Sequence, residues 1–104
     1  QQEKKNQQPI IIGTQSGDLF QLFGCQATKL PLDIGFAIQK LTWWYHPNEK
    51  RFILFVAGKA SLVQAYLWPL NNKDLQPYWK MVCSDWVLDL IICPNNQSLI
   101  VTCQ

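Results

Sequence analysis

Few residues in this chain of 104 combine the side chains and the spacing that enzymatic chemistry requires. The single histidine, His46, begins the polar stretch His46-Pro47-Asn48-Glu49, directly after an apolar segment. No serine or cysteine in a glycine elbow lies near it in the sequence, so it lacks the nucleophile that a histidine base activates. We therefore expect His46 to occupy a turn between two strands, without a catalytic role.

Asp85 and Asp89 are the nearest approach to a pair of catalytic carboxylates. Four residues apart on an extended strand, their side chains would point the same way but lie about 13 Å from each other. That distance is too long for most reactions that use two carboxyl groups. We expect Asp85 instead to accept hydrogen bonds from backbone groups of its own loop.

Glycines and cysteines give equally little indication of a ligand site. Gly13 and Gly17 form neither a dinucleotide-binding nor a Walker motif, so they predict a hairpin turn and no phosphate site. None of the four cysteines, at positions 25, 83, 93 and 103, forms a CxxC pair, and His46 is distant from all of them. This spacing argues against zinc. It favours buried free thiols in a reducing compartment and leaves a disulfide open.

The aromatic run Trp43-Trp44-Tyr45 could form a stacking platform for bases or sugars, or it could belong to a protein core. The formal net charge is only +2, and the lysines are scattered apart from Lys4-Lys5. Without a basic stripe, direct binding of nucleic acid is disfavoured and core packing is preferred. The sequence thus assigns no catalytic, cofactor-binding or metal-ligating residue, predicts no cofactor, and indicates no small-molecule ligand.

The elements that would position these residues are short β-strands. The composition is 48% hydrophobic and 12% aromatic with only 15% charged residues, which is typical of a folded domain. Residues 38–70 read as three consecutive strands, at 38–45, 52–56 and 62–68, each ended by turn residues. The strand at 52–56 is apolar throughout and the strand at 38–45 has aromatics on both faces. We expect both strands to be covered on both sides.

Further strands are predicted on either side of this stretch. The segments 10–12 and 19–23 are apolar runs separated by a glycine-containing turn, so they predict a β-hairpin. A further strand is expected at 28–32, where Pro31 confines it to a sheet edge. Strands are also expected at 78–83, 86–93 and 99–103, with a turn at 94–96. Residues 1–8 form a polar leader. The segments 24–27, 33–37 and 71–76 are expected to be exposed loops.

An internal repeat relates these strands. Similar segments begin at Ile11, Phe55 and Ile100, which are 44 and 45 residues apart. A period near 40–45 residues with four short strands is typical of propeller blades. We predict an all-β protein of antiparallel four-stranded blades, an incomplete fragment of a larger ring, with Trp43, Trp44 and Trp86 packed between blades. The expected division is a leader at 1–8, a partial blade at 9–32, a complete blade at 38–83 and half a blade at 86–104. A self-contained small β-sandwich is the alternative.

The residues also resemble a known family. The segment IIIGTQSGDLFQLF resembles the hairpin between the second and third strands of a WD-repeat blade, and SLVQAYLWPL places Trp68 at the position of the family's tryptophan. The chain departs from the family at Pro69, where an aspartate is usual, and it lacks the histidine and the turn aspartate of the family's stabilising tetrad. The resemblance implies a diverged member that binds partner proteins through its faces and loops.

A narrower likeness lies in residues 78–89, YWKMVCSDWVLD. This segment is similar to one in the WD-repeat subunits that partner tRNA wobble-position 2′-O-ribose methyltransferases. It implies a non-catalytic accessory subunit with a methyltransferase partner, contacting tRNA only through the complex, in the cytoplasm or nucleus. The longest apolar run, 52–58, is too short to span a membrane, so no membrane association is expected. The alternative function is a segment of an enzymatic propeller of the quinoprotein or hydrolase type.

Overall fold

The chain forms β-strands and turns, with no helix in the described residues. The computed structural model describes residues 9–71, 73, 75–93 and 98–104. The predicted leader at 1–8 and the whole of the predicted turn at 94–96 therefore lie outside the described residues. The strands are β1 (Ile10–Gly13), β2 (Asp18–Phe23), β3 (Gln26–Asp33), β4 (Ile38–His46), β5 (Arg51–Gly58), β6 (Leu62–Trp68), β7 (Trp79–Val82), β8 (Val87–Cys93) and β9 (Ser98–Cys103).

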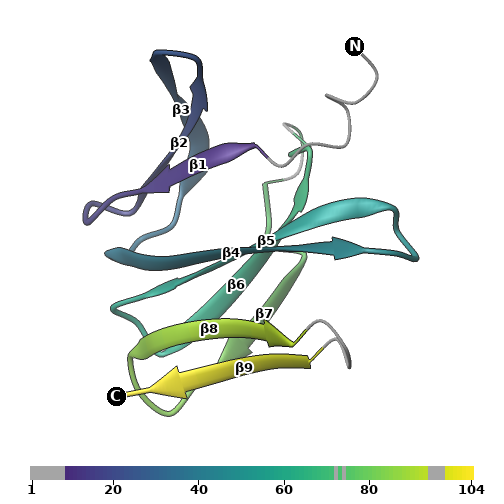
Figure 1. Cartoon of the computed structure of the whole chain (residues 1–104). Helices are drawn as coiled ribbons and strands as arrows, with labels where there is room; N and C mark the ends of the chain where they lie inside the picture. The colour runs from purple at the N-terminus through teal and green to yellow at the C-terminus, as the bar shows by residue number, and fades with distance from the viewer. Residues whose placement is uncertain (1–8, 72, 74, 94–97) are drawn as a thin grey trace.

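These strands make three sheets, which follow one another along the chain (Figure 1). The first has the order β1-β2-β3, the second β4-β5-β6-β7 and the third β8-β9. Every pair of neighbours is antiparallel and consecutive in sequence. Antiparallel strands that follow one another need only short connections, which the turn residues supply. The predicted all-β, antiparallel fold class is confirmed.

Most strand positions agree with the sequence prediction. β6 covers residues 62–68 as expected, and Pro31 lies in β3, which is an edge strand of its sheet. The prediction of a turn beginning at His46 was wrong by one residue. β4 continues through His46, because this residue pairs with Arg51 in the β4–β5 ladder and the turn starts only at Pro47.

The central strand β5 belongs to two hydrophobic cores at once. Leu54 and Val56 point to the first sheet and join a cluster with Leu19 of β2 and Leu32 of β3. Successive side chains of a strand point to opposite faces, so the intervening residues of β5 point to the third sheet. There Ile53, Phe55 and Ala57 form a second cluster with Val87 and Leu90 of β8. The predicted covering of both faces of this strand is confirmed.

The tryptophans divide between buried and exposed positions. Trp43 packs against the first cluster and Trp44 against the second, so neighbouring residues of β4 contact opposite sheets as predicted. Trp86 differs from the prediction that it packs between sheets. It lies just before β8, outside both clusters, and is 45% exposed. Trp86 precedes the first pair of the β8–β9 ladder, and its backbone carbonyl accepts a hydrogen bond from the Gln104 amide at 2.8 Å. This bond holds the backbone but leaves the ring exposed.

The loop at 33–37 is less exposed than the sequence suggested. β3 extends to Asp33, and Ile34 is buried, at 5% exposure, in the first cluster. The Ile34 amide donates a hydrogen bond to the Gly17 carbonyl at 3.0 Å, and the Ala37 carbonyl accepts one from the Lys59 amide at 3.0 Å. The loop therefore ties the first hairpin to the end of β5. The segment 24–27 also differs, because residues 26 and 27 belong to β3.

Candidate functional site

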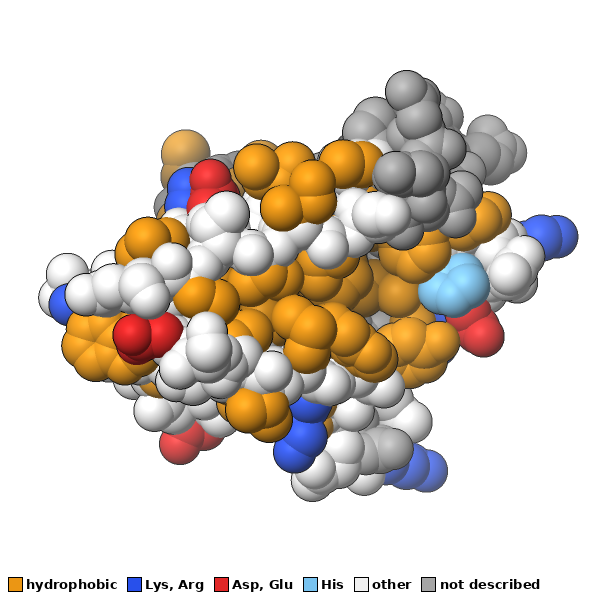
Figure 2. All heavy atoms as spheres, turned by 90° about the horizontal axis from the view of Figure 1, so that it is seen from below, with side chains coloured by type: hydrophobic (Ala, Val, Ile, Leu, Met, Phe, Trp, Pro, Cys, Tyr) orange, Lys and Arg blue, Asp and Glu red, His pale blue; other side chains and the backbone are white. Residues whose placement is uncertain are grey.

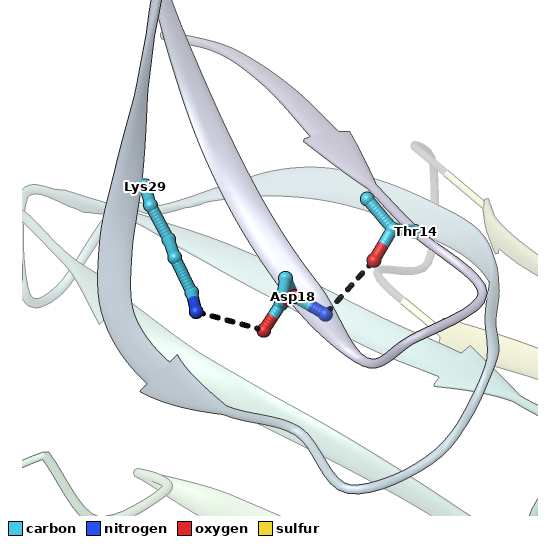
Figure 3. Close-up of polar contacts among 3 residues, drawn as sticks. All are labelled: Thr14, Asp18 and Lys29. Atoms are coloured by element: carbon cyan, nitrogen blue, oxygen red, sulfur yellow. Dashed lines mark hydrogen bonds and ion pairs between the residues drawn. The ribbon is translucent and has the colours of Figure 1, made fainter.

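A small polar cluster closes the first hairpin (Figure 3). The Thr14 hydroxyl, at the start of the β1–β2 turn, accepts a hydrogen bond from the Asp18 amide at 3.1 Å. The Asp18 carboxylate in turn lies 3.5 Å from the Lys29 ammonium of β3. The three residues therefore connect the turn, the start of β2 and β3. The Asp18 carboxylate and the Lys29 ammonium neutralise each other, so they provide no acid–base pair for catalysis. The contacts of the cluster instead stabilise the hairpin.

We expect the variant Thr14→Val to lower the free energy of unfolding by about 1 kcal/mol, the usual value of one hydrogen bond. Valine keeps the β-branched shape but cannot accept the hydrogen bond from the Asp18 amide. Thr28→Val is the matched control, because Thr28 is an exposed residue of β3. Urea denaturation measures both changes. Equal stability of the two variants would show that the Thr14 hydroxyl contributes nothing specific.

His46 lies at one end of an apolar groove. Its Nδ1 accepts a hydrogen bond from the Glu49 amide at 3.3 Å, and its ring lies 4.9 Å from the Trp44 ring, measured between centroids. The Nδ1 atom of His46 is thus engaged in the turn, and no serine, threonine or cysteine is among the described residues that line the groove. The sequence-based expectation that His46 has a local structural role agrees with this geometry.

The groove itself was not predicted from the sequence. It has a volume of about 210 Å³ and lies between β9 and the second sheet, all four strands of which contribute residues to its lining. In Figure 2, which views this face, hydrophobic side chains continue across the centre and the imidazole stands at one end of them. Besides Trp44 and His46 of β4, the walls come from Phe55 of β5, Trp79 of β7 and Leu99 of β9. Strands that are distant in sequence build it, so no local pattern indicates it.

Asp85 and Asp89 have separate local roles. The Asp85 carboxylate accepts a hydrogen bond from the Trp86 amide at 2.7 Å, which confirms the predicted backbone role. Asp89 accepts one from the Leu90 amide at 2.9 Å, and its carboxylate lies 3.5 Å from the Lys40 ammonium. Each carboxylate is thus engaged with partners of its own.

All four cysteines are free thiols. Cys25 is exposed, and Cys83, Cys93 and Cys103 are half-buried, so the prediction of buried thiols was wrong for Cys25 and only partly right for the others. Burial raises the pKa of Cys83, and the neighbouring Cys103 raises it further. A raised pKa keeps Cys83 protonated at neutral pH and makes it a poor nucleophile.

Within the described part of the chain, histidine, cysteine and acidic residues form no group of three that could hold a metal ion. The same residues include no helix of the length and apolarity that crossing a membrane requires. The Arg51 guanidinium makes a further local contact, because it donates hydrogen bonds to the carbonyls of Trp68 and Pro69 at 3.4 and 2.8 Å. That contact fixes the end of β6, so its role is structural.

The apolar groove and the exposed Trp86 segment are candidate binding surfaces. Comparisons of the chain with models of protein families, with curated proteins and with solved structures gave no match.

Proposed function

We propose that the chain is a non-catalytic protein-interaction scaffold built from blades of a WD-repeat type β-propeller. The observation that supports this most is the packing of consecutive antiparallel sheets through two apolar interfaces that share β5. The sequence repeat of 44 and 45 residues places equivalent segments in β1, β5 and β9, the successive sheets. Sheets stacked at a fixed sequence period are the arrangement of a propeller.

The contacts of the polar side chains also support a scaffold. The polar side chains discussed above are engaged in local contacts: Thr14 and Asp18 in the first hairpin, Arg51 at the end of β6, and Asp85 before β8. The exposed side chains, in contrast, include large hydrophobic ones, which mark interaction surfaces when they gather. Binding of other proteins accounts for these surfaces better than chemistry on a small molecule does.

In its specific form, the proposal is an accessory subunit of a tRNA wobble-position 2′-O-ribose methyltransferase, acting inside the cell. It rests on the likeness of residues 78–89, whose C-terminal part exposes two large hydrophobic side chains. Trp86 is 45% exposed and Leu88 is 49% exposed. The Asp85 carboxylate accepts a hydrogen bond from the Trp86 amide, which fixes the backbone there. An exposed tryptophan in a fixed backbone is a common anchor of protein interfaces. The partner would contact tRNA, and this chain would contact the partner.

The test measures ribose methylation at the wobble position of tRNA by mass spectrometry after deletion of the gene that encodes this chain. We expect the modification to be lost and to return with the wild-type gene. Trp86→Ser should weaken copurification of the methyltransferase at least about tenfold, the effect of losing an interface anchor. The control is Phe23→Ser, because Phe23 is a 60% exposed aromatic on the first sheet. Methylation that persists after deletion would exclude the methyltransferase partner.

A further inference from the structure

Cys83 is fixed at one end of the second sheet. It directly follows β7, and its amide donates a hydrogen bond to the Ser61 carbonyl at 2.9 Å. Its thiol donates a long hydrogen bond to the Met81 carbonyl at 3.9 Å, and the side chain is half-buried against the second cluster. The Cys83 sulfur therefore lies in the interface between the second and third sheets, where β7 ends.

Cys103 lies at the same end of this interface, on the third sheet. Leu99 and Val101 of β9 pack against the second cluster. Side chains two residues apart on a strand point to the same face, so the half-buried Cys103 also points toward the second sheet. Cys103 stands opposite Val87, where β8 begins and β9 ends (Figure 1). Only residues 84–86 separate Val87 from Cys83.

The electrostatics of Cys83 also make the two thiols neighbours. Burial raises the pKa of Cys83, and both the charge of Cys103 and a side-chain hydrogen bond with it raise that pKa further. A hydrogen bond requires the two sulfur atoms to be close to each other. The other two thiols are placed elsewhere, because Cys93 stands at the opposite end of β8 and Cys25 lies in the turn between β2 and β3.

We propose that Cys83 and Cys103 are a redox-sensitive pair, which hydrogen peroxide converts to a disulfide between the second and third sheets. Cys103 reacts first, since Cys83 is held in its protonated form. The Cys103 sulfur attacks one peroxide oxygen, the O–O bond breaks, and a sulfenic acid and one water result. The Cys83 sulfur then attacks the sulfenic sulfur, and the departing oxygen takes the Cys83 proton as a second water. The two thiols are oxidised by two electrons and the peroxide is reduced by two.

The disulfide would fasten one whole sheet to its neighbour. β8 and β9 both lie within residues 83–103, the loop that the bond closes. Closing a loop restricts the unfolded chain and so stabilises the folded one. Oxidation would thus add a covalent link to the apolar contacts between the second and third sheets. This switch goes beyond the scaffold function and depends on no partner, so the methylation test and the test of the switch have separate outcomes.

The test treats the reduced 104-residue chain with a small excess of hydrogen peroxide, blocks the remaining thiols and maps the products by mass spectrometry. Chymotrypsin suits the digestion, because cleavage after Trp86 and Leu99 separates Cys83, Cys93 and Cys103. We expect the main product to be a monomer with a bond between Cys83 and Cys103, which dithiothreitol reverses. The melting temperature of the oxidised chain should exceed that of the reduced chain by at least about 5 °C.

Matched variants keep two thiols each. The double variant Cys25→Ser/Cys93→Ser retains the proposed pair and should form the bond as the wild type does. Cys25→Ser/Cys83→Ser retains Cys93 and Cys103 at opposite ends of the third sheet, and its yield of intramolecular disulfide should be at least about tenfold lower. The wild-type map needs no substitution, so it stays decisive if a variant fails to fold.

Three results would overturn the proposal. The first is a wild-type map in which Cys83 and Cys103 become sulfinic acids without a bond between them. The second is a mixture in which all pairings of the four cysteines occur equally. The third is oxidation that yields only dimers linked between chains. Each would show that the two thiols do not meet in the folded chain.

Discussion

Trp43→Ala is expected to lower the free energy of unfolding by about 3–5 kcal/mol, the range for removing a large aromatic side chain from a core. The Trp43 ring meets two other rings edge to face, those of Phe52 at 5.9 Å and Trp68 at 5.5 Å between centroids. It also packs against the cluster between the first and second sheets. Alanine would leave a cavity where three aromatic rings now meet, and two ring pairs would be lost together.

The matched control for this variant is Trp86→Ala. It removes the same side chain from a position that is 45% exposed and outside both core clusters, so we expect a change of less than about 1 kcal/mol. Guanidinium denaturation followed by far-ultraviolet circular dichroism suits both variants, because that signal comes from the backbone and not from the removed indole. Similar losses from the two variants would show that the Trp43 ring is not part of the core.

Gly58→Ala is expected to cost about 3 kcal/mol, although it adds a single methyl group. A Cβ on Gly58 would lie 1.9 Å from the carbonyl oxygen of Ala37 and 2.9 Å from the backbone nitrogen of Gln39. Both neighbours are backbone atoms, and the Ala37 carbonyl is held by the Lys59 amide. The loop between the first and second sheets would have to move away from β5 to make room.

Gly24→Ala separates this steric effect from the general cost of replacing a glycine. Gly24 has a positive φ of 60°, but a Cβ there would meet nothing within 4 Å. Alanine at Gly24 should therefore cost only the roughly 1 kcal/mol of a left-handed backbone conformation. Thermal melts of the two variants compare the effects directly. A melting temperature for Gly58→Ala at or above that of Gly24→Ala would disprove the close approach of Ala37.

The sequence predicted the strands well because each one carries a local signal. The apolar run of β5 and the alternation in β4 depend only on neighbouring residues, and so do the turn residues between strands. Trp43 and Trp44 could be assigned to opposite faces for the same reason, since alternation is a property of any strand. These predictions needed no knowledge of which sheets meet.

The contacts between sheets were not predictable in the same way. The burial of Ile34 depends on its hydrogen bond to Gly17, and both lie outside any regular pattern. The groove requires Phe55, Trp79 and Leu99 to come together from three strands of two sheets. Trp86 was wrongly assigned to a sheet interface for a related reason. In the sequence, a large apolar side chain next to a strand looks the same whether or not a second sheet covers it.

The position of β5 in both cores has a consequence for how the chain unfolds. A stack of sheets that touch only their neighbours can lose its end units one at a time, as repeat proteins do. Here one strand carries side chains of both interfaces on its two faces. Strain in one interface that displaces Leu54 also displaces Phe55, its covalent neighbour in the other interface. β4 and β6 also contribute residues to both interfaces, so the second sheet couples the three sheets. This coupling favours cooperative unfolding of the stack over the independent loss of a sheet.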